Sequence, residues 1–455
     1  MDLKHLLFLL LFAPTIVFGQ HTIKGTFMPA GEFEMALLYK VTPTHSNYVT
    51  NSPIATDGSF TIKLDSTVTK GIYRITYAVP QEEYNFDVIY NGEEDIELKF
   101  NSETGVEFLA SRENKLLESY TNSMLMITNS IGNYFRDNSK TKDTLALEAI
   151  FKTQRETQKG FEEASKGTIA SNFIKANSPY IPEGIVDVET YVKGLETHYF
   201  DHVDFNNETL QRSKFLTERM LNYVFGMSSK PGNEEADYKR NIKVFDNAMI
   251  HAPNTVKKAL YTDLWEQMVD LKIDAVANFI AENYLMDLSV KLNDQQLLEA
   301  LILYRNTAIG AQAPDFAMDI TKAKKTTKTL LSKLDSAEHY IIAFWSSSCS
   351  HCLKEIPELH KLITPFEEEK VKVIAIGLED NPYGWKTLTY DFPDFIHVYG
   401  EGKWDNPIGN DYGVTATPTY FVLDKDKKIV LKPEDFEALK AFLETAVTPT
   451  EAEKE

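Results

Sequence analysis

The stretch that decides the fold of the C-terminal part of this chain is Ile341-Ile342-Ala343-Phe344-Trp345-Ser346-Ser347-Ser348-Cys349-Ser350-His351-Cys352. Five apolar residues typical of a buried strand lead through a short serine turn into a helical pattern. A turn that opens into a helix places the Cys349 sulfur at the helix N-terminus, where free N–H groups and the helix dipole stabilise a thiolate. Cys352 follows one turn later, close enough to form a disulfide with Cys349. The sequence therefore predicts a redox-active cysteine pair.

Composition narrows the possible functions. The two cysteines are the only ones in 455 residues, so no cysteine is left for a structural disulfide and stability must come from apolar cores. The chain has 47 Lys and Arg against 67 Asp and Glu, a net charge of −20 spread along its length. Such a surface repels phosphate backbones and anionic lipid, so nucleic acid is not an expected partner.

The N-terminus has the pattern of a secretory signal peptide. A weakly basic start precedes residues 6–18, which are nearly all apolar, and Gly19 offers a small residue for cleavage. The apolar stretch is too short to span a bilayer of about 30 Å. An uncleaved anchor or a buried helix is the alternative. We expect a periplasmic protein that is cleaved near Gly19 and is not inserted in the membrane afterwards.

Changes in hydrophobic period divide the remaining chain into four parts. Residues 20–104 alternate in period two between turn signals, which predicts an antiparallel β-sandwich or small barrel of six to eight strands. Residues 105–306 have apolar positions at helical spacing, broken by prolines, and residues 447–455 form an acidic tail. Residues 307–446 alternate strands and helices, which predicts a parallel sheet flanked on both faces. The expected fold class is thus multidomain, with a C-terminal α/β domain.

The expected elements of that domain are well separated along the chain. We predict strands at 340–345, 371–378, 419–423 and 428–431, and helices at 350–366, 384–391 and 434–446.

Residues 309–446 resemble the thioredoxin superfamily, and within it the secreted TlpA/ResA-like thiol-disulfide reductases. The resemblance rests on motifs in matching order and spacing: Ala313-Pro314-Asp315-Phe316, Phe344-Trp345, Cys349-Ser350-His351-Cys352, Lys354-Glu355-Ile356-Pro357, and Tyr412-Gly413-Val414-Thr415-Ala416-Thr417-Pro418-Thr419-Tyr420-Phe421. They cover under a third of the chain. The β-rich and helical segments upstream resemble the N-terminal extension of secreted bacterial members of this group.

The resemblance implies a mechanism and a set of partners. Cys349 attacks a disulfide of a partner protein, and Cys352 resolves the mixed disulfide. Thr417 and Pro418, joined by a cis peptide bond, face the cysteines and pair with the incoming peptide as an added strand. Trp345 completes the expected partner-binding residues. We expect protein thiols or disulfides as substrates, a membrane protein as electron donor, and no cofactor.

Two further residues have candidate roles beside the cysteines. Thioredoxin carries its buried acid six residues before the first cysteine, where this chain has Ala343. Glu355, three residues after Cys352 on the same helix face, has the place of the acidic residue in TlpA/ResA-like proteins, where it would relay the proton. A solvated helix glutamate is the alternative. A protonated His351 would stabilise the Cys349 thiolate, whereas an exposed neutral imidazole would not.

Other chemistries are disfavoured. A Cys-x-x-Cys is also half of a zinc clip, but the sequence has no second one, so we expect no metal. His198 and His202 have helical metal-site spacing, yet no glutamate follows the first histidine and surface histidines are commoner. The peroxidase motif Pro-x-x-x-Thr-x-x-Cys is absent before Cys349. Ser348 replaces the tryptophan that many relatives have before the first cysteine, which removes part of the apolar rim.

The sequence thus predicts an exported thiol-disulfide oxidoreductase that acts as a reductase. The alternative is a ligand- or partner-binding scaffold whose thioredoxin-like domain is regulatory or senses redox state. The size of the extension before residue 307 motivates this alternative.

Overall fold

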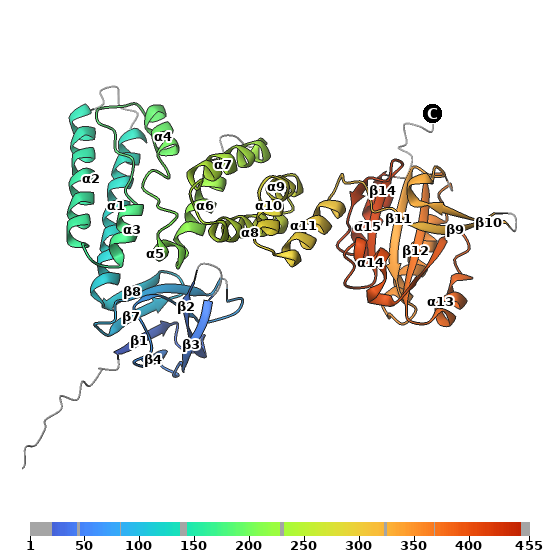
Figure 1. Cartoon of the computed structure of the whole chain (residues 1–455), viewed down its shortest axis with the longest axis horizontal. Helices are drawn as coiled ribbons and strands as arrows, with labels where there is room; N and C mark the ends of the chain where they lie inside the picture. The colour runs from blue at the N-terminus through green and yellow to red at the C-terminus, as the bar shows by residue number, and fades with distance from the viewer. Residues whose placement is uncertain are drawn as a thin grey trace, which may run out of the picture. The chain divides into compact units, whose positions relative to one another are not determined.

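The computed structural model describes residues 21–42, 46–81, 83–136, 143–227, 232–322, 325–367 and 369–446 (Figure 1). The expected signal peptide and acidic tail lie outside these residues. By internal contacts the chain divides into two compact units, Met1–Leu264 and Trp265–Glu455. None of the described helices is long and apolar enough to cross a membrane.

Two four-stranded sheets begin the first unit, with strand orders β4-β1-β7-β8 and β3-β2-β5-β6. The strands are β1 (His21–Met28), β2 (Met35–Val41), β3 (Ser46–Pro53), β4 (Ser59–Leu64), β5 (Gly71–Thr76), β6 (Asn85–Tyr90), β7 (Ile96–Asn101) and β8 (Gly105–Ala110). Period-two alternation is clearest in β4, where Phe60, Ile62 and Leu64 are buried between exposed neighbours. One hydrophobic cluster draws residues from both sheets, including Ile23 of β1 and Leu38 of β2.

One strand pairing departs from the predicted antiparallel arrangement. β1 and β7 run parallel, with Ile23 opposite Ile96, whereas the other pairings in these two sheets are antiparallel. Alternation assigns each side chain to a face of the sheet but contains no information about strand direction. Strands β2 to β6 separate β1 from β7 along the chain, and a connection of that length permits parallel pairing.

The strand-rich part extends beyond the expected boundary at residue 104. Gly105–Ala110 form β8, antiparallel to β7, although the sequence pattern placed them in the helical region. Leu109 lies 41% exposed on this strand. A stretch of six residues is too short for its apolar positions to distinguish a period of 2 from one of 3.6.

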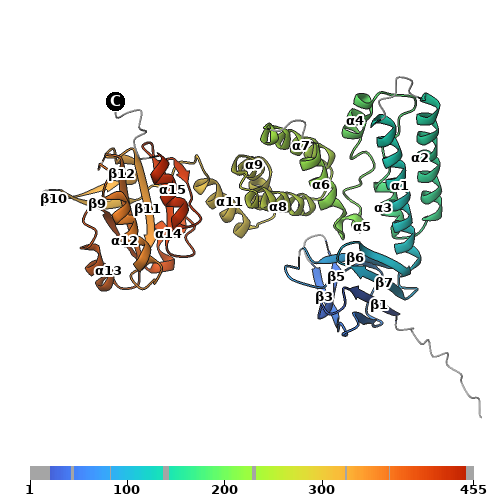
Figure 2. The same ribbon diagram turned by 180° about the vertical axis from the view of Figure 1, so that it is seen from behind.

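Helices fill the rest of the first unit. They are α1 (Arg112–Arg136), α2 (Thr144–Ala164), α3 (Ala170–Ala176), α4 (Val188–Thr197), α5 (Glu208–Gln211), α6 (Phe215–Gly226), α7 (Glu234–Ala248) and α8 (Asn254–Asp270), which crosses into the second unit. Asp143, Asp187 and Asn207 cap the starts of α2, α4 and α5 by accepting backbone N–H groups. Figures 1 and 2 show α1, α2 and α3 packed side by side.

Buried Asn114 ties α1 to the β6 strand. Its side-chain oxygen accepts the N–H of Ile89 at 2.8 Å, and its amide nitrogen donates to the Ile89 carbonyl at 2.7 Å. The side chain therefore replaces a neighbouring strand at this edge of the sheet.

The second unit starts with helices and contains the five-stranded sheet β13-β12-β11-β14-β15. Its helical elements are α9 (Asp274–Ile280), a π-helical turn (Ala281–Leu285), α10 (Met286–Lys291), α11 (Gln295–Thr307), a 3-10 turn (Leu331–Lys333), α12 (Cys352–Ile363), α13 (Pro382–Thr389), a second 3-10 turn (Lys403–Asp405), α14 (Pro407–Asp411) and α15 (Phe436–Ala446). Its strands are β9 (Ala317–Lys322), β10 (Lys325–Leu330), β11 (His339–Trp345), β12 (Val371–Glu379), β13 (Ile396–Glu401), β14 (Thr419–Asp424) and β15 (Ile429–Leu431). The compact unit begins at Trp265, upstream of the expected boundary at residue 306.

The sheet is mixed rather than wholly parallel. β11, β12 and β13 run parallel, as predicted, but β14 is antiparallel to both β11 and β15. The helical crossover through α12 returns the chain parallel to β11, whereas the short turn between β14 and β15 makes a hairpin. The sequence did not predict three elements of this domain, namely β13, α14 and the β9–β10 hairpin. The hairpin projects from the domain (Figure 1).

Both faces of the sheet are buried, which explains the unbroken apolar run of β11. Ile341, Ala343 and Trp345 belong to a cluster that contains residues of α12, α13 and α15. The intervening β11 residues belong to the opposite cluster, which contains residues of β9 and the segments around α14. The sheet therefore holds the C-terminal end of β11 rigidly, and that end carries the cysteine loop.

We expect Gly377→Ala to destabilise the C-terminal unit. A Cβ at Gly377 of β12 would lie 2.0 Å from the Trp385 indole nitrogen, so α13 would have to move. Overpacking of this kind costs about 1–3 kcal/mol in the free energy of unfolding. Urea unfolding followed by tryptophan fluorescence reports this unit, because all four tryptophans lie at or after residue 265. Gly384→Ala is the control, since its Cβ would meet only a serine hydroxyl at 3.4 Å; equal stability of the two variants would contradict the prediction.

Candidate active site

The cysteine pair lies where β11 ends and α12 begins. The Cys349 N–H donates to the Ser346 carbonyl at 3.1 Å, which closes the turn after Trp345. Both cysteines are free thiols; Cys352 is fully buried and Cys349 is partly exposed. One sulfur is therefore accessible to a partner and the other is not.

Hydrogen bonds surround the Cys349 sulfur. It accepts the N–H of Cys352, the first residue of α12, at 3.3 Å, and its thiol donates to the Thr417 carbonyl at 3.2 Å. Partial burial acts to raise the pKa of Cys349, but hydrogen bonds, chiefly from the thiol and N–H of Cys352, hold this pKa below the ordinary cysteine value. The accessible sulfur is thus the one that ionises more readily.

Cys352 has the opposite character. Burial, followed by the hydrogen bond to Cys349, raises the pKa of the Cys352 thiol to about 12. Near neutral pH this thiol stays protonated and must lose its proton before it can attack another sulfur. The arrangement therefore needs a proton acceptor near Cys352.

Glu355 lies one turn after Cys352 on α12 and is half-buried. The phenol of Tyr420 on β14 donates to its Oε2 at 3.0 Å. Tyr420 is buried, and burial, then the Glu355 charge, raises the pKa of Tyr420, so the phenol stays a proton donor. The structure thus holds a carboxylate in the region where the sequence predicts a proton relay.

Tyr420 was missed as a site residue. Tyr420 pairs with Ala343 in the β11–β14 register. Ala343 occupies the position where thioredoxin has its buried acid. The only sequence signal for Tyr420 was its place in the matched stretch 412–421. Its contact with Glu355 depends on β14 pairing with β11, which hydrophobic pattern does not reveal.

Thr417 and Pro418 lie beside Cys349. The peptide bond between them is cis, as the resemblance implied, and the Thr417 carbonyl is the group that accepts the Cys349 thiol. Both residues are half-exposed. The structure therefore brings Thr417 together with the accessible cysteine.

His351 and Trp345 differ from their predicted surroundings. His351 is exposed and lies directly before α12. Its backbone N–H lowers the pKa of Cys349, and no contact of its imidazole with Cys349 is described. Tuning by the imidazole stays a prediction. Trp345 is 1% exposed inside the core cluster, so its predicted contact with a partner is wrong. A strand buried on both faces leaves its last large side chain inside the domain.

The loop before Cys349 is held by its own serines and by one distant residue. The Ser346 and Ser348 hydroxyls lie 2.9 Å apart, and the Ser348 N–H donates to the Ser346 hydroxyl at 3.2 Å. The Ser347 N–H donates to the carboxylate of Glu379, the last residue of β12. Glu379 has no motif around it, and sequence analysis did not find it.

The histidines of the helical region have an ordinary structural environment. His198 follows α4, its Nδ1 lies 2.6 Å from Asp201 Oδ2, and its ring stacks on Tyr180 with ring centres 4.7 Å apart. Within the described ranges, no group of three or more His, Cys, Asp or Glu side chains could hold a metal ion.

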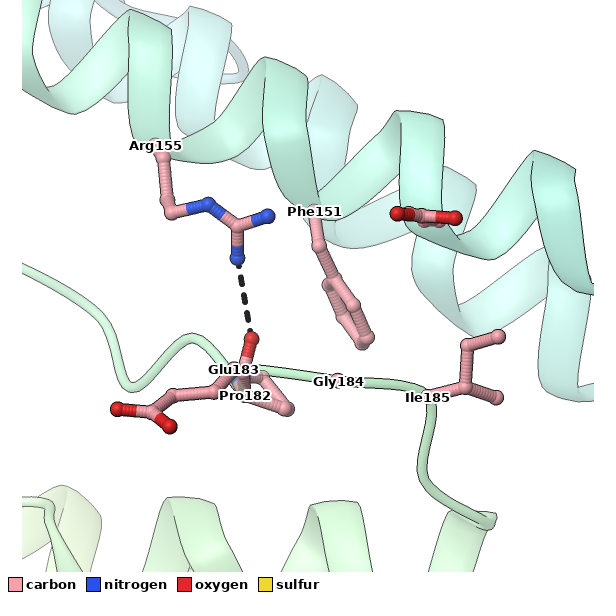
Figure 3. Close-up of a pocket in the computed structure, with 7 residues that line it drawn as sticks. Phe151, Arg155, Pro182, Glu183, Gly184 and Ile185 are labelled. Carbon is pink, nitrogen blue, oxygen red and sulfur yellow. Dashed lines mark hydrogen bonds between the residues drawn. The ribbon is translucent and has the colours of Figure 1, made fainter.

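A pocket in the first unit lies between α2 and residues 182–185 (Figure 3). Phe151 points from α2 towards this segment, and Arg155 donates from Nη1 to the Pro182 carbonyl at 3.0 Å. Its other lining residues are Glu148, Glu183, Gly184 and Ile185. None of these residues is a cysteine, so the pocket lacks the thiol that disulfide exchange needs and is not the candidate active site.

Comparison with known proteins places the match in the C-terminal part of the chain. Residues 308–437 match the Redoxin family. The thiol-disulfide oxidoreductase ResA of Bacillus thuringiensis subsp. konkukian is 31% identical over 126 residues, which cover 27% of this chain and 67% of that protein. A ResA of Bacillus cereus is 30% identical over 145 residues, 31% of this chain and 79% of the relative.

Two of the solved structures that are similar to this chain come from Bacteroides and Cytophaga. A thioredoxin-like protein from Bacteroides caccae is 18% identical, covering 58% of this chain and 96% of its own, with a TM-score of 0.31. A domain of a possible thiol-disulfide isomerase from Cytophaga hutchinsonii is 27% identical, with a TM-score of 0.26. The match covers 30% of this chain and 92% of that structure. From the sequence relatives, the chain belongs to the ResA-like thiol-disulfide oxidoreductases of the thioredoxin superfamily.

Proposed function

We propose that this protein is an exported reductase that reduces disulfides of partner proteins through Cys349 and Cys352. The observation that carries the proposal is the asymmetry of the pair. The partly exposed Cys349 has a pKa below the ordinary value, and the buried Cys352 has a pKa of about 12. One thiol is suited to attack a partner, and the other is protected until the mixed disulfide forms.

The proposed reaction proceeds in two exchanges. The Cys349 thiolate attacks one sulfur of the partner disulfide, so a mixed disulfide forms and one partner thiolate leaves. Cys352 then gives up its proton and attacks the Cys349 sulfur, which closes the Cys349–Cys352 disulfide and releases the second partner thiolate. The partner gains two electrons and two protons. A membrane protein would return the two electrons to this disulfide.

Neighbouring residues have supporting roles in this proposal. Glu355, oriented by the Tyr420 phenol, accepts the Cys352 proton. The Thr417 carbonyl accepts the Cys349 thiol in this structure. When an extended partner segment binds beside Pro418, the Thr417 backbone would release the thiol and hydrogen-bond to that segment. His351 would tune the thiolate from its exposed position.

The organisation of the remaining chain also belongs to this proposal. Residues 1–19 would be removed on export, and the protein would act in the periplasm. The hydrophobic cluster shared by β1 to β8 supports a β-sandwich formed by the two N-terminal sheets, followed by the helical region. The thioredoxin-like domain and the acidic tail would complete the chain.

We expect the redox potential of the Cys349–Cys352 pair to lie nearer about −270 mV, as in thioredoxin, than about −120 mV, as in DsbA. The Cys349 thiolate is stabilised by the hydrogen bond from the Cys352 N–H and not by a described ionic contact, so its stabilisation is modest. Thiol trapping across a series of glutathione ratios measures the potential. A value near that of DsbA would make the protein an oxidant or isomerase and would overturn the reductase.

A further inference from the structure

A buried carboxylate supports the loop that carries the nucleophile. Glu379, at the end of β12, is 6% exposed, and its Oε1 accepts the N–H of Ser347, two residues before Cys349. Burying a carboxylate is costly unless the group is paired or hydrogen-bonded. A glutamate at this position therefore needs a reason that packing alone does not supply.

Among the described residues, Glu379 has acidic neighbours and no ion pair with a cation. Its neighbour in sequence is Asp380, and its register partner on β13 is Glu401; both are exposed acids. The ion pairs of the described C-terminal unit do not include Glu379. The hydrogen bond from the Ser347 N–H is thus the described interaction that satisfies this carboxylate.

The same hydrogen bond is the external anchor of the loop backbone. The N–H groups of Ser348 and Cys349 donate to the hydroxyl and carbonyl of Ser346, which are acceptors within the loop. The Ser347 N–H donates to another strand. Among the described bonds of these three N–H groups, that to Glu379 alone fixes the loop relative to the sheet.

We propose that Glu379 is a positioning residue for the thiol-disulfide exchange, and that it holds the 346–349 loop so that the Cys349 sulfur meets the Cys352 N–H and the Thr417 carbonyl. The inference rests on the proposed role of Cys349 as the nucleophile. Those two contacts, at 3.3 and 3.2 Å, are short enough that a small shift of the loop would weaken both. Glu379 acts through its acceptor oxygen, so its negative charge is not required.

Variants of Glu379 in the full chain separate the acceptor from the charge. Glu379→Gln keeps an oxygen at the same reach and loses the charge, whereas Glu379→Asp keeps the charge and withdraws the oxygen by one methylene. We expect Glu379→Asp and Glu379→Ala to slow alkylation of Cys349 by iodoacetamide about tenfold at neutral pH, and Glu379→Gln to stay within about twofold of wild type. Glu401→Gln, a neutralised neighbour outside the loop contacts, is the control and should behave as wild type.

The redox potential supplies a second readout that a purely structural role would not change. Of the two contacts, the N–H of Cys352 is the one that stabilises the Cys349 thiolate, because the Thr417 carbonyl accepts only from the protonated thiol. A weaker bond from this N–H makes the reduced form less favourable, so Glu379→Asp should become more reducing, by about 30 mV for a tenfold change in the equilibrium constant. Slow alkylation of Cys349 in Glu379→Gln together with a wild-type alkylation rate in Glu379→Asp would show that the charge matters, and this would overturn the proposal. Wild-type alkylation rates in both variants would also overturn it. If Glu379→Ala does not fold, Glu379→Asp and Glu379→Gln still distinguish the acceptor role of Glu379 from a role of its charge.

Failure of the proposed function gives a different result. Reduction of insulin disulfides is measured on the same wild-type sample. An inactive wild type would contradict the reductase, while the alkylation rates of the variants would still test the position of Cys349.

Discussion

Cys349→Ser is expected to abolish disulfide reduction, with a loss on the order of a thousandfold or more, because a serine hydroxyl does not ionise near neutral pH and is a poor nucleophile without an adjacent base. Cys352→Ser should lose turnover as well, but for a different reason. Its Cys349 still attacks, and the mixed disulfide then accumulates because the resolving thiol is absent. The two variants therefore assign the order of the two cysteines.

Insulin reduction and non-reducing electrophoresis measure these two outcomes. Cys352→Ser should trap partner proteins as adducts that dithiothreitol releases, and Cys349→Ser should trap none. Ser350→Ala, an exposed change between the cysteines, is the control and should keep wild-type turnover. Adducts on Cys349→Ser but not on Cys352→Ser would reverse the assignment of nucleophile and resolving cysteine.

Glu355→Gln is expected to slow the resolving step about a hundredfold, the lower end of what general acid–base catalysis contributes. The buried Cys352 thiol, with a pKa of about 12, cannot ionise readily without an acceptor. Tyr420→Phe should have a smaller effect in the same direction, because it removes the phenol that orients Glu355 and leaves the carboxylate in place. The first attack by Cys349 should change little in either variant.

Stopped-flow mixing with a fluorescent disulfide peptide separates the two steps. Release of the second peptide thiol reports resolution, and formation of the adduct reports attack. Glu358→Gln on the exposed face of α12 serves as the control. A resolving rate in Glu355→Gln equal to that of the control would remove Glu355 from the proton relay.

Much of the C-terminal domain was predictable because its local patterns are strong. The predicted strands at 340–345 and 371–378 correspond to His339–Trp345 and Val371–Glu379, and the helix from 350 begins at Cys352. β13 escaped because its burial is irregular along six residues. Strand direction was not predictable in either unit. The parallel pairing of β1 with β7 and the antiparallel pairing of β14 with β11 depend on how the chain connects the strands and not on hydrophobic periodicity.

The active site was predictable to the extent that its residues lie in sequence motifs. Cys349, Cys352, Glu355 and the Thr417–Pro418 pair were named from the motifs, and the structure places Thr417 against Cys349. Trp345 was assigned to the partner surface because it is aromatic and close to the cysteines, yet it points into the core.

The sequence by itself determined the cysteine pair, the strand–turn–helix that presents it and the family to which the chain belongs. These features are local, because a helix start, a Cys-x-x-Cys spacing and a buried strand are each encoded within a few consecutive residues. Only the tertiary structure decided that Tyr420 holds Glu355 and that Glu379 holds Ser347. Those contacts span 65 and 32 positions of the chain, and they exist because pairing in one sheet brings β14 and β12 to either side of β11.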